Sequence, residues 1–272
     1  MKKAELLSTL EKYGIAPAKS RGQNFLIDNN LLDAMCRSMD IQAGETILEV
    51  GPGAGVLTRE MLKLGGIVHA VEFDFAIQRY LSENLEHEKF TLHKGDACKV
   101  DYKEILDLPR EFRCLANLPY AISSIFIAIM SELESPPLEM YFLLQREMAE
   151  RLAADNSTKN YGSLTVRVQA LYDVNILRIV PPEVFFPPPK VQSAFVTLKL
   201  KENPPSPKVL KKLNSIVRAA FSQRRKVAFK LMKGTAGPKL EEAYETVGLD
   251  RKARAEQITI EQYIQLAETL LA

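Results

Sequence analysis

The stretch that most constrains the fold of this chain spans residues 47–58 and reads ILEVGPGAGVLT. Its first apolar residues predict a buried strand, and the glycines that follow let the backbone turn sharply and approach a ligand closely before a helix begins. A second apolar run at residues 67–71 ends at Glu72, where a doubly wound fold carries the carboxylate that binds a ribose. The complete order of strand, glycine turn, helix, strand and acid predicts a nucleotide-binding α/β fold, whereas a Gly-rich turn alone would be weak evidence.

The sequence of the glycine turn indicates which nucleotide it binds. A dinucleotide-binding turn has Gly or Ala at the place of Val56, and here Glu49 stands just before the first glycine. Gly-x-Gly-x-Gly preceded by an acid resembles the S-adenosylmethionine loop of class I methyltransferases more than the loop of a dehydrogenase. We therefore expect S-adenosyl-L-methionine as the cofactor.

The alternation of strands and helices continues beyond this unit. Further strands are predicted near residues 90–93, 113–116 and 140–144, with helical patterns between them. Such alternation indicates a parallel sheet with right-handed crossovers, and ligands lie beyond the carboxyl ends of its strands. We therefore expect a Rossmann-like α/β sheet that gathers the following residues along one edge: Gly51, Glu72, Asp96 and Asn117.

A late strand and two proline clusters organise the second half of the chain. Residues 191–198 alternate as a strand, which we expect to form a hairpin with residues around 174–180. The proline-rich stretch 181–190 is stiff because proline fixes φ. The second cluster, at 203–207, is typical of a linker, and the pattern beyond it is purely helical.

Charge is distributed unevenly along the chain although the net charge is only +2. Residues 1–24 hold five Lys or Arg against two acids, and residues 199–239 hold twelve against one, so the remainder sums to −12. This asymmetry is typical of a nucleic-acid binder. We therefore expect a catalytic cofactor-binding domain at 1–200 and a helical RNA-docking domain at 201–272. A solvated helix face is the alternative for three lysines: Lys208, Lys211 and Lys212.

Composition excludes several other classes of protein. Apolar stretches are short and broken by charge, and the N-terminus has no apolar segment of signal-peptide length, so we expect a cytoplasmic protein without a membrane-spanning segment. The cysteines form no CxxC pair and the histidines stand at no ligand spacing, which predicts no metal site. We interpret these residues as core thiols and as structural or surface imidazoles: Cys36, Cys98, Cys114, His69, His87 and His93.

The most informative tetrapeptide is NLPY at residues 117–120, which follows a predicted strand. The exocyclic amine of a base is a poor nucleophile because its lone pair is delocalised into the ring, so a methylating site must hold the base flat and accept hydrogen bonds from the amine. Asn117 offers a side-chain carbonyl, Leu118 a backbone carbonyl and Tyr120 an aromatic face. A strand-to-loop turn with a buried tyrosine is the alternative. With the glycine turn, the motif resembles those of methyltransferases that modify adenine or cytosine amines.

Further motifs follow in one order along the chain. They are QNFL at 23–26, EVGPG at 49–53, NLPY at 117–120, QRE at 145–147, YG at 161–162, Phe185 followed by PPPKV at 187–191, FSQRRK at 221–226 and RAE at 254–256. From about residue 19 to 264 this series resembles the ribosomal RNA adenine dimethyltransferases, and most closely the branch that acts on the small subunit. The resemblance implies dimethylation of two adjacent adenosines near the 3′ end of 16S rRNA, with the small subunit or its precursor as partner and a monomeric enzyme.

The resemblance also implies roles for individual residues. It places around S-adenosylmethionine the residues Asn24, Leu26, Gly51, Gly53, Glu72, Asp96 and Asn117. Glu72 would accept hydrogen bonds from the ribose hydroxyls, and Asp96 from the adenine amine of the cofactor. Contacts with RNA phosphates are implied for Arg224, Arg225 and Lys226.

Four residues are implied to form the catalytic site: Asn117, Leu118, Tyr120 and Phe185. Phe185 would stack on the target base opposite Tyr120. The alternative for Phe185 and its neighbour Phe186 is that one of them packs in the core. Three positions depart from the family pattern and put local contacts in doubt: Arg21, Ala121 and Gln192.

Two other functions remain open from the sequence. The macrolide-resistance branch of the family dimethylates one adenosine in 23S rRNA, although the proline-stiffened aromatic segment and the long basic tail argue against it. A ribosome assembly factor with secondary catalysis is the other, and both roles could coexist.

Overall fold

Seven strands form the central sheet: β2 (Thr46–Val50), β3 (Ile67–Glu72), β4 (Phe90–Lys94), β5 (Arg113–Asn117), β6 (Glu139–Gln145), β7 (Tyr172–Val180) and β9 (Ser193–Leu200). They are ordered β4-β3-β2-β5-β6-β9-β7 in a computed structural model that describes residues 3–15, 23–108 and 110–272. The strands β2 to β6 pair in parallel, and β9 pairs antiparallel with both β6 and β7. The expected Rossmann-like α/β sheet and the late hairpin are both confirmed.

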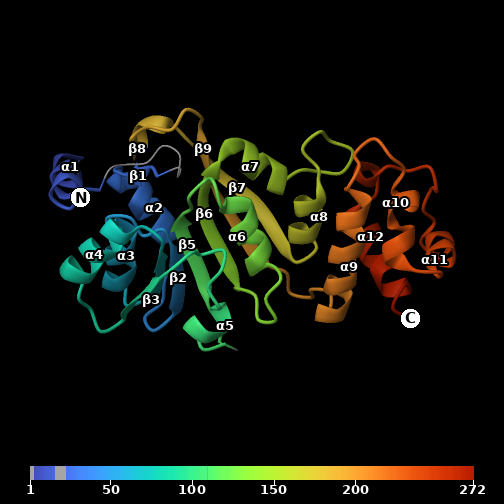
Figure 1. The fold of residues 1–272 in the computed structure, drawn as a ribbon, viewed down its shortest axis with the longest axis horizontal. Coiled ribbons are helices and arrows are strands. Elements are labelled where there is room, and N and C mark those ends of the chain that lie inside the picture. The colour runs from blue at the N-terminus through green and yellow to red at the C-terminus, as the bar shows by residue number, and fades with distance from the viewer. Residues whose placement is uncertain (1–2, 16–22, 109) are drawn as a thin grey trace.

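Helices cover both faces of the sheet (Figure 1). One face shares a core with α1 (Lys3–Lys12), α2 (Asn29–Met39), α3 (Val56–Lys63) and α4 (Phe75–Asn84). The other packs against α5 (Tyr102–Ile105), α6 (Ser123–Met130) and α7 (Arg146–Leu152). Strand β2 contributes side chains to both cores, because Ile47 belongs to the first and its neighbour Leu48 to the second. This two-sided burial explains why the strand reads as a continuous apolar run.

The C-terminal region is helical and has a core of its own. It contains α9 (Pro207–Ala220), α10 (Ala228–Ala236), α11 (Leu240–Val247) and α12 (Ile260–Thr269), which lie at the far end of the molecule from the N-terminus (Figure 1). Helix α8 (Ser163–Gln169) contributes Val166 to this core and Val168 to the core of the sheet. The packing of the helical region therefore reaches back across the division that we predict at residue 200.

Glu132 joins the helical region to the rest of the molecule. It lies just after α6, and its carboxylate accepts hydrogen bonds from Arg167 of α8 and from Arg218 of α9, the latter at 2.6 Å. A second junction is the loop 153–162, where the hydroxyl of Tyr161 donates to the carbonyl of Ile258 at 3.0 Å. The helical region is thus held at two places.

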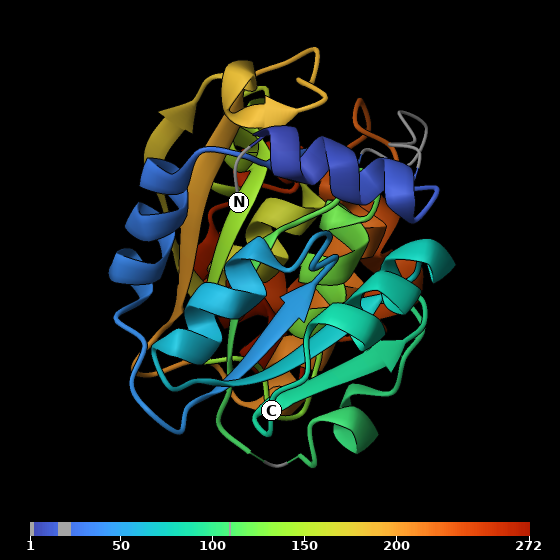
Figure 2. The same cartoon turned by 90° about the vertical axis from the view of Figure 1, so that its left-hand side faces the viewer.

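A small antiparallel ribbon lies apart from the main sheet. It pairs β1 (Phe25–Leu26) with β8 (Phe185–Phe186), in segments where the sequence predicted only a loop and a proline-rich stretch. Figure 2 shows the β8 segment and α1 on the side toward which the arrowhead of β2 points. The ribbon therefore lies near the carboxyl ends of the parallel strands, where a doubly wound sheet binds its ligands.

Candidate active site

The glycine turn between β2 and α3 packs closely against two other segments, β1 and the NLPY tetrapeptide. Gly51 and Gly53 have φ values of 66° and 56°, which residues other than glycine rarely adopt. A Cβ atom at Gly51 would lie 3.0 Å from Cγ of Pro119, and one at Gly53 would lie 3.1 Å from the ring of Phe25. The turn therefore uses glycine both for its backbone conformation and for the close approach of β1 and the NLPY tetrapeptide.

Two adjoining cavities open at this turn. The first, of about 90 Å³, is lined by the glycine turn, β1 and the NLPY tetrapeptide, and we name it the turn cavity. The second, of about 300 Å³, lies toward the end of β4 and is named the strand-end cavity. Residues that line both are Gln23, Gly51, Glu72 and Pro119. The two cavities therefore lie side by side and share part of their walls.

Most residues expected from the sequence line these cavities. The turn cavity is lined by Asn24, Leu26, Gly51, Gly53, Glu72, Asn117, Leu118 and Tyr120. Asp96 lines the strand-end cavity, where its carboxylate accepts a hydrogen bond from the backbone of Cys98 at 2.9 Å. The fold thus brings together residues from five separate parts of the chain.

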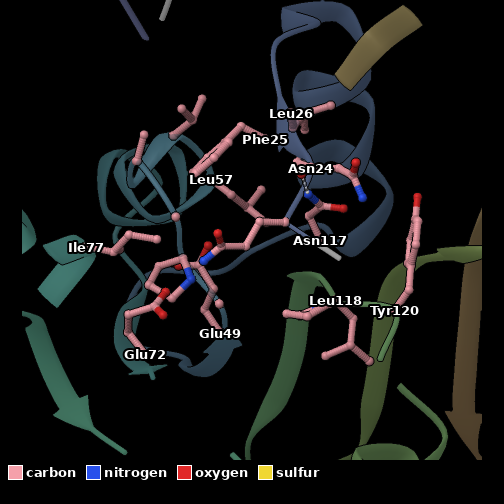
Figure 3. Close-up of a pocket in the computed structure, with 17 residues that line it drawn as sticks. Asn24, Phe25, Leu26, Glu49, Leu57, Glu72, Ile77, Asn117, Leu118 and Tyr120 are labelled. Carbon is pink, nitrogen blue, oxygen red and sulfur yellow. Dashed lines mark hydrogen bonds between the residues drawn. The ribbon is translucent and has the colours of Figure 1, made fainter. Parts of the chain in front are cut away.

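Two buried carboxylates lie on one side of the turn cavity (Figure 3). Glu72 is 5 % exposed and accepts a hydrogen bond from the backbone N–H of Asp74 at 2.7 Å. Burial raises the pKa of Glu72 to about 7. Glu49 is 2 % exposed, accepts from the hydroxyl of Thr58 at 2.6 Å, and has its pKa raised by burial to about 8. Both are therefore groups whose charge changes near neutral pH.

The amide of Asn117 has a defined orientation. Its Nδ2 donates to the backbone carbonyl of Asn24 at 2.6 Å, a bond that only the nitrogen can make, because the carbonyl is an acceptor. The side-chain oxygen of Asn117 is therefore the group that can accept from a ligand. In Figure 3, Asn117 stands beside Asn24, between the two carboxylates and Tyr120.

Tyr120 stands on the other side of the turn cavity (Figure 3). Its hydroxyl oxygen lies 2.5 Å from Oγ of Ser193, the first residue of β9. Leu118 is fully buried, with its side chain in the core of the sheet, so what it can offer a ligand is its backbone. Tyr120 itself is only partly buried and lines the turn cavity, so the alternative of a strand-to-loop turn with a buried tyrosine is wrong.

Phe185 does not line either cavity. Its side chain is 2 % exposed and packs in the core on the α1–α4 face, while Phe186 is partly buried. Consecutive residues of a strand point to opposite sides, so pairing of Phe185 with Leu26 in the ribbon buries one of the two aromatic rings. In this conformation Phe185 is the residue that packs in the core. Its stacking on a base stays a prediction that requires the ribbon to move.

The basic residues expected to contact RNA are remote in sequence from the cavities. Arg224, Arg225 and Lys226 are exposed in the connection between α9 and α10. Arg224 also donates to the backbone carbonyl of Lys159, in the loop that joins α7 to α8. The connection is thus fastened to a segment that leads back to β6. Arg21, where the sequence departs from the family pattern, lies outside the described residues.

Three features of the structure, two of them in the site, were not expected from the sequence. Glu49 was noted only as part of the turn motif, yet it lines the cavity. Phe25 lines the turn cavity from the ribbon, and Ser193 contacts Tyr120 from β9. His69 and His93, interpreted as unconnected, stack with Nδ1 and Nε2 3.1 Å apart on neighbouring strands.

Within 3–15, 23–108 and 110–272, no group of three or more His, Cys, Asp or Glu side chains could hold a metal ion. None of the helices in that part of the chain is long and apolar enough to span a membrane.

Known proteins resemble this chain over nearly its whole length. A family model described as "Ribosomal RNA adenine dimethylase" matches residues 17–271. A protein of Clostridium acetobutylicum named "Ribosomal RNA small subunit methyltransferase A" is 36 % identical over 274 residues, covering 99 % of each chain. A protein of the same name from Thiobacillus denitrificans is 39 % identical, covering 91 % of this chain and 95 % of its own.

Two solved structures share the fold. A dimethyladenosine transferase from Plasmodium falciparum has a TM-score of 0.69 and 24 % identity, covering 89 % of this chain and 95 % of its own. The 23S rRNA methyltransferase ErmE has a TM-score of 0.65 and 24 % identity, covering 92 % of this chain and 100 % of its own. At this level of identity the likeness concerns the fold alone.

Proposed function

The chain belongs to the ribosomal RNA adenine dimethylase family, and on that premise we propose that it dimethylates the exocyclic amines of two adjacent adenosines near the 3′ end of 16S rRNA. The methyl donor is S-adenosyl-L-methionine, and the substrate is the small ribosomal subunit or its precursor. The enzyme acts as a monomer in the cytoplasm. The observation that carries the proposal is the convergence of the glycine turn, Glu72 and Asn117 on one site.

The site fits the proposed cofactor. A Cβ atom at Gly51 or Gly53 would crowd Pro119 or the ring of Phe25, so the glycines keep these two residues of the cavity wall close to the turn. The carboxylate of Glu72 suits ribose hydroxyls, and Asp96 in the strand-end cavity suits an adenine amine. When bound, S-adenosylmethionine supplies a methyl group carried on a positively charged sulfur.

Asn117 has the central role in orienting the substrate. With Nδ2 held by the carbonyl of Asn24, its Oδ1 accepts a hydrogen bond from the adenine amine, and the backbone carbonyl of Leu118 accepts another. Tyr120 stacks on the base, which leaves its helical stack to reach the cavity. No strong base is required, because the amine becomes acidic only once it carries the new methyl group and a positive charge. Positioning is therefore the main source of rate acceleration.

Assay of purified small and large subunits separately tests the substrate. We expect methyl transfer to the small subunit, with dimethyladenosine mapped by mass spectrometry near the 3′ end of its rRNA. Methyl transfer to the large subunit alone would instead favour the macrolide-resistance activity. That alternative is disfavoured by the small-subunit name of the relatives that match over nearly the whole chain.

Asn117→Ala tests the mechanism. We expect turnover to fall by about 100-fold or more, because a preorganised polar contact to the reacting group is lost, while cofactor binding falls less. Isothermal titration with S-adenosylmethionine and single-turnover methylation separate the two effects. Unchanged turnover would refute the role of Asn117. If the variant still supports subunit maturation in cells, an assembly role exists beside the catalytic one.

A further inference from the structure

Ser193 is a buried hydroxyl beside the NLPY tetrapeptide. Its side chain is 0 % exposed, and its Oγ lies 2.5 Å from the hydroxyl oxygen of Tyr120. Tyr120 is only partly buried and lines the turn cavity. A tyrosine ring rotates about two side-chain bonds, and its hydroxyl oxygen lies on the axis of the second, so a hydrogen bond at the tip restricts the first rotation, which swings the whole ring. The contact with Ser193 therefore fixes where the ring stands beside the turn cavity.

The backbone at Ser193 is a fixed point in the sheet. Ser193 is paired with Gln145 of β6 on one side and with Val180 of β7 on the other. The preceding residue, Gln192, accepts two hydrogen bonds from Arg146, one from the backbone N–H at 3.0 Å and one from the guanidinium at 2.9 Å. Ser193 can therefore hold Tyr120 without moving itself.

We infer that Ser193 is a positioning residue for methyl transfer, which holds the ring of Tyr120 at the place where the flat base stacks while Asn117 accepts from the amine of the base. The inference rests on the proposed function and adds to it a residue that does not touch the base. Since Ser193 is completely buried, its hydroxyl needs a partner, and Tyr120 provides it.

The second methyl transfer depends on this arrangement more than the first. An unmodified adenine amine has two N–H groups, one for Asn117 and one for Leu118. The first transfer forms an N–C bond, breaks the S–C bond of the donor and releases one amine proton to solvent. The monomethylated amine then has only one N–H left to donate. Stacking on Tyr120 therefore provides a larger share of the interactions that hold the base.

The test is Ser193→Ala, assayed on small subunits that lack the methyl groups, with the nucleoside products resolved by mass spectrometry. We expect the first transfer to slow by about 3- to 10-fold, the typical effect of one hydrogen bond. Monomethyladenosine should accumulate, and the affinity for S-adenosylmethionine should stay unchanged. Tyr120→Phe should give the same product pattern, and the double variant should show no further loss, because both changes remove one bond.

The control is Ser131→Ala. Ser131 is also buried and donates one hydrogen bond, to the carbonyl of Ile127 at 2.8 Å, but it lies at the opposite end of α6 from the NLPY tetrapeptide. This variant should keep the wild-type ratio of products. Ser193→Thr retains a hydroxyl and should restore part of the dimethylated product.

Two results would overturn the inference. One is a wild-type ratio of monomethyl to dimethyl product in both Ser193→Ala and Tyr120→Phe. The other is losses that simply add in the double variant. If Ser193→Ala does not fold, Tyr120→Phe decides alone, because it keeps the aromatic ring and removes only the hydroxyl that Ser193 contacts. Absence of dimethyladenosine with the wild-type protein would instead refute the proposed function.

Discussion

The raised pKa of Glu72 makes cofactor affinity depend on pH below neutrality. Its burial, at 5 % exposure, raises the pKa of Glu72 to about 7, so roughly one tenth of the molecules carry the carboxylate at pH 6 and roughly nine tenths at pH 8. If only the carboxylate form accepts from both ribose hydroxyls, the apparent Kd for S-adenosylmethionine should be about tenfold higher at pH 6 than at pH 8.

Glu72→Gln should remove this dependence. The variant should bind about 10- to 100-fold more weakly at pH 8, the usual effect of losing hydrogen bonds to a charged group, and should change little between pH 6 and pH 8. Isothermal titration at constant ionic strength measures both constants. Glu49→Gln is the matched control, because it removes the other buried carboxylate and should keep the step near pH 7. Equal wild-type affinity at pH 6 and pH 8 would refute the reasoning.

The raised pKa of Glu72 also makes the stability of the ligand-free protein depend on pH. Because the folded state holds the proton of Glu72 more tightly than the unfolded state, the free energy of unfolding falls as pH rises from about 4.5 to about 7. A shift from 4.5 to about 7 corresponds to about 3 kcal/mol. Urea denaturation should show that the free energy of unfolding of Glu72→Gln rises relative to that of the wild type by about 3 kcal/mol between about pH 4.5 and about pH 7. A difference that does not vary with pH would contradict the burial argument.

Two further predictions concern the glycine turn and the basic connection. Gly51→Ala should weaken cofactor binding by about tenfold or more, because the new Cβ atom would lie 3.0 Å from Pro119. The control is Gly248→Ala, because Gly248 also has a positive φ, 71°, but has open space around the new Cβ atom. This control should lower the melting temperature through backbone strain and leave cofactor binding unchanged. Neutralising Arg225 and Lys226 should reduce the slope of log affinity for rRNA against log salt by about 1.5 to 2. Adding Arg224 should change it less, because Arg224 already donates to a backbone carbonyl. An unchanged slope in filter binding would indicate a solvated loop.

The parts of the site that follow from local sequence were predictable. Strand β2, the glycine turn and Glu72 lie within one unit of the chain, and its periodicity and turn residues are sufficient to order them. Asn117 and Asp96 could be placed because parallel strands end at the same edge.

The remaining features depend on pairing between distant segments. The ribbon joins Leu26 to Phe185 through strands of only two residues, which are too short for any periodic signal. That pairing decides which aromatic ring is buried. Ser193 was likewise predictable as a strand residue but not as the partner of Tyr120, because that contact depends on β9 lying beside β6.

Helix α6 connects the NLPY tetrapeptide to the C-terminal helices. It begins three residues after Tyr120, where the hydroxyl of Ser123 donates to the carbonyl of Tyr120, and it ends two residues before Glu132. Eight helical residues make a stiff rod of about 12 Å. A rotation of the C-terminal helices would therefore be transmitted along α6 to the NLPY tetrapeptide, which we propose holds the adenine.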